Sequence, residues 1–280
     1  MNDQNVKFLE DSLFNLGFGD KLNEQLKTNM KENQTEFQLD FSNEQKVPGT
    51  EALDKIQYQL HFKRAKDMDM YFFNSYTAKL TDETNQSKEQ LFYVNKSRGV
   101  TSKEAYNLLS GRAVNKNLIN KEGEKYNAWI QLDFSNKDKY DNHMTRVFHE
   151  KYQFGLNEGL AQLPIKGKET GLSDSLLNSL HKGNLTPVTF VKDDKEFKRF
   201  VAANPQYKNI DVYDENGKYL FHTKKKQEGV KVESKEETKN TTKTKGESTA
   251  PKKEKKTGTA KAKKPRTRVS ESAAGKSMKK

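Results

Sequence analysis

The sequence predicts an α+β protein in which helices are followed by antiparallel strands, an order that occurs twice, with a basic tail after it. Apolar residues recur at helical spacing near the N-terminus and again after residue 155. Each helical segment is followed by stretches in which apolar and polar residues alternate. Aromatic residues stop at Phe221, whereas residues 223–280 hold 20 Lys and Arg against 7 Asp and Glu. Runs of helices and then of strands favour α+β over a doubly wound parallel sheet.

Two helices are predicted in residues 2–30, because two apolar stripes have helical spacing. The stripes are formed by Val6, Leu9, Leu13 and Leu16, and by Leu22, Leu26 and Met30. Gly17 and Gly19 interrupt the pattern between them, and Asp20 is expected to cap the second helix.

Four antiparallel strands are expected next. Residues 35–41 and 55–64 alternate apolar and polar side chains with period two, as half-buried strands do. Residues 70–80 predict a third strand, reached through a charged turn at 65–69, and residues 91–94 predict a fourth. The first 95 residues therefore indicate two helices followed by one sheet.

A second unit is expected to begin with the segment TSKE at residues 101–104. This segment has the form of a capping box, in which a Thr hydroxyl and a Glu carboxylate accept hydrogen bonds from free amides at a helix start. Gly111 is expected to end that helix. Residues 119–134 predict a hairpin with its turn at 121–124, and residues 135–145 predict a polar loop.

The last part of the body is predicted as two short helices followed by a small meander of strands. These elements are expected at residues 155–163, 173–181, 188–192, 197–202 and 210–221. The dipeptide Asn216-Gly217 is a strong signal for the final hairpin turn. Because helices precede a sheet at 2–94 and again at 155–221, the order is compatible with an internal duplication, although no residue-level identity supports one.

We therefore divide the chain into an N-terminal α+β unit at 1–98, a C-terminal α+β unit at 99–222 and a Lys-rich tail at 223–280. Residues 1–222 are called the body and residues 223–280 the tail. The formal net charge of +12 resides in the tail, because acidic and basic residues nearly balance in the body. The tail lacks a periodic apolar stripe, so burial cannot offset its chain entropy and we expect it to be disordered.

Composition excludes several classes of protein. Cysteine is absent, which excludes a disulfide framework, a thiolate metal site and a cysteine nucleophile. No apolar run reaches the ~20 residues of a membrane helix. The first ten residues lack the basic and apolar regions of a signal peptide. We expect a cytoplasmic protein that makes no membrane contact.

Motifs for catalysis are weak. Metal-ligand residue types cluster at Asp141, His143, His149 and Glu150. The spacing between the two histidines fits no helical pair, so a polar loop is the preferred interpretation. Residues 167–170 resemble only the end of a phosphate loop, because Gln162 occupies the position of its first glycine, and a Gly-x-Ser-x-Gly motif is absent. We expect a protein that is not an enzyme and has no catalytic residue, metal or cofactor.

The dense positive charge of the tail is the most specific physical signal. Its main cations are Lys252, Lys253, Lys255, Lys256, Lys261, Lys263, Lys264, Arg266 and Arg268. Such a chain binds polyanions by displacing counterions, with a log K against log salt slope of roughly −7 to −9 for ~10 phosphates. The alternative is a solubilising tail whose charge is incidental.

Several strings of residues resemble a known family. They are DMYFFN at 69–74, AYNLLSGRAV at 105–114, NKEGEKYNAWIQLDF at 120–134, KGNLTPVTF at 182–190 and ANPQYKNIDVY at 203–213. Together they resemble an uncharacterised domain-of-unknown-function family carried on bacterial conjugative and other mobile elements. A stretch similar to the GRAV run is also found appended to mobile-element type IA topoisomerases. The resemblance implies a cytoplasmic protein of plasmid or transposon biology with DNA nearby, and it carries no established catalytic residues.

Two functional hypotheses follow. The first is a non-catalytic accessory nucleic-acid-binding protein of a mobile element, whose tail gives non-specific affinity for DNA. Its candidate residues on the body lie around the predicted hairpin and are Arg112, Lys116, Tyr126, Trp129 and Gln131. Their pattern is equally that of an ordinary sheet, and a lone Trp on a strand is more often part of a core.

The second hypothesis is a protein-interaction module that docks a conjugation, replication or defence component, with the tail as a solubiliser. A cationic groove on the body would favour nucleic acid, whereas a contiguous exposed apolar patch would favour a protein partner.

Overall fold

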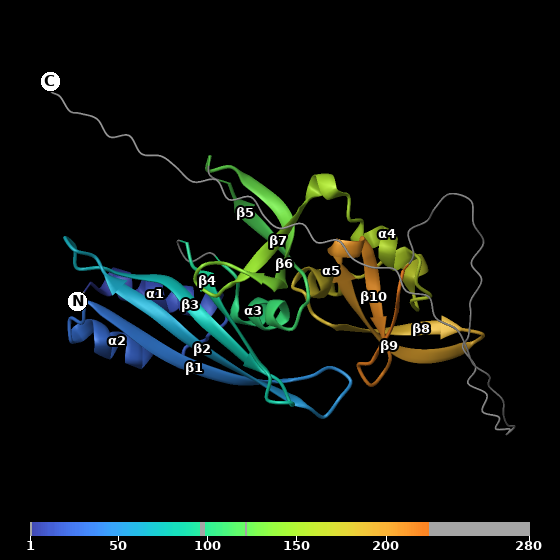
Figure 1. Ribbon diagram of the computed structural model, residues 1–280, viewed down its shortest axis with the longest axis horizontal. Coiled ribbons are helices and arrows are strands. Elements are labelled where there is room, and N and C mark those ends of the chain that lie inside the picture. The colour runs from blue at the N-terminus through green and yellow to red at the C-terminus, as the bar shows by residue number, and fades with distance from the viewer. Residues whose placement is uncertain (1, 96–98, 121, 224–280) are drawn as a thin grey trace, which may run out of the picture. The chain divides into compact units, whose positions relative to one another are not determined.

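The α+β class predicted from the sequence is confirmed by a computed structural model of the chain, which describes residues 2–95, 99–120 and 122–223 (Figure 1). In these residues, five α-helices accompany three antiparallel sheets. The sheets have the strand orders β1-β2-β3-β4, β5-β6-β7 and β11-β10-β9-β8. The tail, for which we predicted disorder, lies outside the described residues except for Thr223.

The two N-terminal helices are α1 (Asp3–Asn15) and α2 (Asn23–Lys31). Their apolar stripes are buried as the spacing predicts. The expected Asp20 cap is wrong, because the N-cap of α2 is Leu22 and no side chain caps it. Helix α1 is tied to the sheet by buried Asn5, whose side chain donates to the Tyr71 carbonyl oxygen at 3.0 Å and accepts from the Tyr71 amide at 2.7 Å.

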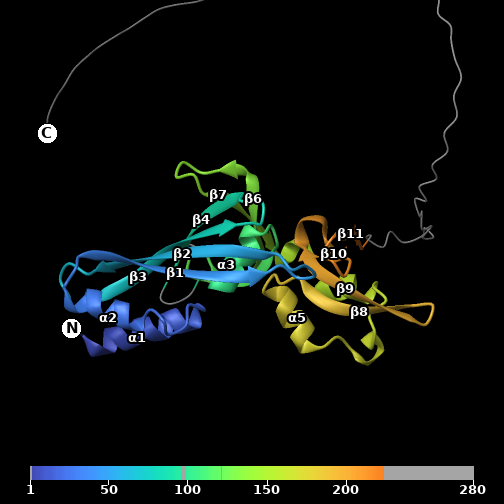
Figure 2. The same cartoon turned by 90° about the horizontal axis from the view of Figure 1, so that it is seen from below.

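The first sheet is an antiparallel meander in chain order. Its strands are β1 (Glu36–Lys46), β2 (Leu53–Arg64), β3 (Tyr71–Thr81) and β4 (Ser87–Tyr93). The first, second and fourth strands extend beyond the ranges predicted from the alternation. One face carries the buried apolar side chains, and Figure 2 shows α1 and α2 on that side of the sheet. The opposite face is polar, which follows from the period-two pattern.

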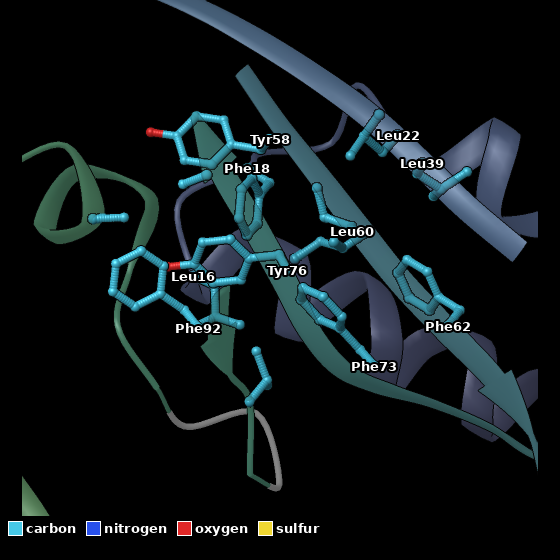
Figure 3. Close-up of a cluster of buried hydrophobic side chains, with 14 of the residues drawn as sticks. Leu16, Phe18, Leu22, Leu39, Tyr58, Leu60, Phe62, Phe73, Tyr76 and Phe92 are labelled. Carbon is cyan, nitrogen blue, oxygen red and sulfur yellow. The ribbon is translucent and has the colours of Figure 1, made fainter. Parts of the chain in front are cut away.

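Aromatic rings fill the core between this sheet and the helices (Figure 3). Phe18, in the link between α1 and α2, is only 1% exposed. It makes edge contacts with four rings at centroid separations of 5.2 to 6.2 Å. The interruption at 17–19 that separates the two helices thus also inserts a ring into the centre of the core.

Helix α3 (Ser102–Leu109) begins with the capping box that the sequence predicts. The Thr101 hydroxyl accepts from the Glu104 amide, and the Glu104 carboxylate accepts from the Thr101 amide. Two core tyrosines fix this start, because Tyr58 Oη donates to the Ser102 carbonyl oxygen and Tyr76 Oη to that of Val100. Burial raises the pKa of both hydroxyls, so they remain donors at neutral pH.

The second sheet differs from the predicted hairpin. Its strands are β5 (Val114–Ile119), β6 (Lys125–Lys137) and β7 (His143–His149). The predicted turn is correct, but β5 precedes the expected hairpin start. The polar loop expected at 135–145 is wrong, because it contains the end of β6 and the start of β7. None of the side chains of β7 is fully buried, and its sequence shows no clear apolar alternation.

Strand β6 is buried on both faces. Ile130 and Leu132 belong to the aromatic cluster that includes α1 and α2, whereas Trp129 belongs to a second cluster around the C-terminal helices. The first cluster therefore contains residues from before and after the predicted 98/99 boundary. Ile130 and Leu132 alternate with polar Gln131 and Asp133, and Trp129 is the apolar residue that adds contacts on the second face.

The C-terminal part follows the predicted order of helices and then strands. The helices are α4 (Leu156–Ala161) and α5 (Asp174–His181). The strands are β8 (Thr186–Lys192), β9 (Lys195–Asn204), β10 (Asn209–Tyr213) and β11 (Tyr219–His222). Short 3₁₀ helices occur at Glu150–Tyr152, Lys168–Thr170 and Pro205–Tyr207.

The predicted Asn-Gly turn lies against the β1–β2 turn. Gly217 has a φ of +74°, and a Cβ there would lie 2.6 Å from the Pro48 carbonyl oxygen. Gly49 has a φ of +85°, and a Cβ there would lie 2.6 Å from the Gly217 nitrogen. Both positions therefore need glycine, for conformation and for close approach of the two backbones.

Candidate nucleic-acid interface

Arg112, the first predicted nucleic-acid contact on the body, is bonded within the protein. Its Nε donates to the Gly183 carbonyl oxygen at 2.8 Å and its Nη2 to Asn107 Oδ1 at 2.6 Å. The guanidinium lies over the Tyr106 ring, 5.3 Å from the centroid. Burial lowers the pKa of Arg112, although an arginine side chain stays protonated in proteins. These contacts join the end of α3 to the turn after α5.

Lys116 and Trp129 are also engaged internally. Lys116 Nζ lies 2.8 Å from Glu104 Oε2, in an ion pair that is largely buried. Trp129 is 7% exposed and contacts the rings of Phe154 and His181 at centroid distances of 5.3 and 5.5 Å. The structure therefore places the indole in a core and does not bring these residues together as one surface.

The other predicted contacts divide between the hairpin and the tail. Gln131 Nε2 donates to the Gly111 carbonyl oxygen at 2.8 Å, and the Tyr126 ring lies 5.1 Å from that of His149. The nine tail cations, from Lys252 to Arg268, lie outside the described residues. Their role in binding DNA stays a prediction.

The histidine cluster does not converge. His143 and His149 are the first and last residues of β7, so six residue steps of extended chain, about 20 Å, separate them. Among residues 2–95, 99–120 and 122–223, no three His, Cys, Asp or Glu side chains are grouped so as to hold a metal ion.

A groove on the body gathers positive charge and aromatic rings. It lies between residues 77–93 of β3 and β4 and residues 134–143 at the end of the β6–β7 hairpin, and we call it the β4–β7 groove. Its volume is about 860 Å³. Figure 2 shows the hairpin end projecting on the side of the first sheet opposite α1 and α2. One wall is thus the polar face of the sheet and the other is the hairpin end.

Hydrogen bonds hold the two walls together. The Leu91 amide donates to Asn142 Oδ1 at 3.0 Å, and the His143 amide donates to Gln90 Oε1 at 2.8 Å. The turn between β6 and β7 is shaped by Asp138, whose carboxylate accepts from the amides of Tyr140 and Asn142. These bonds lower the pKa of Asp138. Since the turn is fixed in this way, Tyr140 is held at the mouth of the groove.

Three lysines and two carboxylates line the groove. Lys79 stands directly opposite Glu89 across the strand pair, and Lys137 Nζ lies 2.9 Å from Asp141 Oδ1. Lys88 Nζ lies over the Phe134 ring at 4.5 Å. The surplus charge is positive, so the groove attracts anions such as phosphate.

His143 stays neutral near pH 7, because desolvation and the charge of Lys137 lower its pKa. Its Nδ1 is buried without a hydrogen-bond partner among the described residues. Its ring stands edge-on to Phe134, 4.8 Å away. The charge of the groove near neutral pH therefore comes from its lysines and carboxylates.

Sequence reasoning missed this groove. Its lysines and rings come from a strand pair and from a segment predicted as a loop, so no local motif joins them. One sequence feature does point to the groove. The alternation in the predicted strand 91–94 places Tyr93 on the polar face, opposite Phe92, and so predicts an exposed ring there. The pairing of β4 with the hairpin end is a tertiary contact that this alternation does not encode.

Comparisons of the chain with protein-family models, with curated proteins and with solved structures found no match. The resemblance to the mobile-element family therefore rests on the sequence strings alone. Within the described ranges, no helix combines the length and apolar character that crossing a membrane requires.

Proposed function

We propose that the protein is a non-catalytic, cytoplasmic accessory protein of a mobile genetic element that binds nucleic acid. The observation that carries the proposal is the β4–β7 groove, which three lysines and exposed aromatic rings line from its two walls. Cations paired with rings are the side chains that nucleic-acid-binding surfaces use for phosphates and bases. The strings that resemble the mobile-element family supply the biological context.

The tail supplies a second, less selective contact. Nine cations within 17 residues would displace counterions from DNA whatever its sequence. If all nine contact phosphates of a duplex, log K falls with log salt at a slope of about −8. In this arrangement the tail provides non-specific affinity and the groove provides a positioned contact.

The test measures binding of a labelled DNA duplex to the full chain over a salt series. The matched variant is the full chain with the nine tail cations replaced by glutamine. We expect the variant to lose most of the affinity and most of the salt slope. Binding by neither protein at about 0.1 M salt would refute the proposal. Equal binding by the full chain and by the glutamine variant would show that the tail cations do not contribute to DNA binding.

A different observation favours the second candidate function, docking of a protein partner. A cleft of about 500 Å³ lies between α1 and the start of β3, and its lining mixes polar residues with apolar side chains that include Phe8 and Phe72. Both rings are partly exposed, as in surfaces that bind proteins. Substituting Phe8 and Phe72 with serine should abolish co-purification of such a partner and leave DNA binding unchanged.

A further inference from the structure

The two most exposed rings of the β4–β7 groove lie on its opposite walls. Tyr93 on β4 is 73% exposed, and Tyr140 in the hairpin turn is 69% exposed. Phe134, the third ring, is covered on one face by Lys88 and contacted by His143. Lys139 Nζ lies over one face of the Tyr140 ring, 4.8 Å from its centroid. Tyr93 and the other face of Tyr140 therefore present the apolar ring surface that remains open to a ligand.

Each wall also carries a cation, and each of these cations has a carboxylate beside it, Glu89 opposite Lys79 and Asp141 at 2.9 Å from Lys137. On the sheet wall, Lys79 lies on the same face as Tyr93, because both positions follow the outward register of β3 and β4. On the hairpin wall, Lys137 precedes Tyr140 by three residues. Rings and cations in one groove are the side chains that bind single-stranded nucleic acid, the rings by stacking on bases and the cations near the backbone.

Strand form decides whether such rings can be used. In a duplex, neighbouring base pairs cover the faces of each base, so a side-chain ring reaches only edges and backbone. In an unpaired strand the base faces are free, and stacking on aromatic side chains tolerates any base sequence. A groove of about 860 Å³ is of the size that takes a small ligand, which corresponds to a short run of nucleotides and not to the width of a duplex.

From this geometry we infer that the β4–β7 groove binds single-stranded nucleic acid, with bases stacked on Tyr93 and Tyr140 and phosphates near Lys79 and Lys137. The inference rests on the proposed function and adds the strand form that the groove accepts. The tail binds both strand forms, whereas the groove adds affinity for the unpaired strand alone.

The experiment compares a labelled dT12 single strand with a 12-base-pair duplex by fluorescence anisotropy at about 0.15 M salt, using the full chain. The double variant Tyr93→Ala/Tyr140→Ala should lose at least about tenfold in affinity for dT12 and less than about twofold for the duplex. The variant Tyr93→Phe/Tyr140→Phe keeps both rings and should bind dT12 as the wild type does. Tyr207→Ala removes a 65% exposed tyrosine outside the groove and is the matched control.

Three results would overturn the inference. One is an equal loss for both probes, and another is no loss for either, with wild-type binding intact in both cases. The third is loss in the phenylalanine variant as large as in the alanine variant, which would assign the effect to the hydroxyls. If the wild type binds neither probe, the proposed function fails together with this inference. The three results above overturn the inference alone, because wild-type binding is intact in each of them. Unchanged unfolding midpoints show that the variants are folded.

Discussion

Replacing Phe18 tests the account of the aromatic core most directly. The ring is almost fully buried and makes edge contacts with Phe41, Tyr58, Phe73 and Tyr76. Phe18→Ala removes the ring and leaves a cavity that four rigid aromatic neighbours cannot easily close. Truncations of this kind cost ~3–5 kcal/mol, and the tight surroundings place this one near ~4 kcal/mol.

The conservative variant Phe18→Leu separates ring contacts from apolar volume. Leucine fills most of the space but cannot make edge-to-face contacts, each worth ~0.5–1.5 kcal/mol beyond burial. Since contacts around one ring are not additive, we expect a loss of ~2 kcal/mol in the free energy of unfolding. The matched control is Phe14→Ala in α1, where the ring is 70% exposed and the expected change stays within ~0.5 kcal/mol.

Urea unfolding of the full chain, followed by circular dichroism, measures these differences. With an m-value of ~3 kcal/mol/M, a loss of ~4 kcal/mol lowers the midpoint by ~1.3 M. The reasoning is refuted if Phe18→Ala costs less than ~1 kcal/mol, or if Phe14→Ala costs as much. A changed m-value would show instead that the variant alters the compactness of one of the states.

Three further predictions use the same unfolding assay. Gly49→Ala should cost ~1–3 kcal/mol more than Gly123→Ala, because both glycines have positive φ but only Gly49 abuts another backbone; equal costs would contradict the contact. Glu104→Gln keeps the capping box but breaks the buried pair with Lys116 and should cost ~1–3 kcal/mol, against less than ~1 kcal/mol for Glu51→Gln in an exposed pair. Stability should fall as the pH drops below about 6.5, because desolvation lowers the pKa of three histidines in the folded state and the unfolded chain then binds more protons. These histidines are His61, His143 and His181. The loss of stability at low pH should be smaller in His143→Gln than in the wild type. An equal loss in that variant would show that His143 does not contribute to the pH dependence.

Elements whose determining contacts lie within a few residues of one another were predicted correctly from the sequence. The capping box at 101–104 formed as written, because its two reciprocal hydrogen bonds lie within one helical turn. The alternation in β2 fixed which side chains face the core, since one face of that strand packs and the other does not. The Asn-Gly turn at 216–217 also formed between β10 and β11.

Features that depend on distant partners were missed for a common reason. Strand β7 mixes apolar and polar residues without a regular period, and its pairing with β6 defines it as a strand. The groove required β4 to meet Asn142, a contact between residues about 50 positions apart. Arg112, Lys116 and Trp129 looked like ligand contacts because their partners Asn107, Glu104 and Phe154 could not be inferred from spacing alone.

The two-sided burial of β6 has a consequence for how the sequence can vary in length. Inserting or deleting one residue within the strand would exchange its faces, so the bulk of Trp129 would enter the space of Ile130. Two sets of neighbours would be disrupted at once. Length changes should therefore be tolerated in the 138–142 turn only at the expense of the groove, and not at all in residues 128–132 of β6, before the irregularity between Asp133 and Lys137. Because one strand completes both clusters, the two should also unfold together as a single cooperative unit.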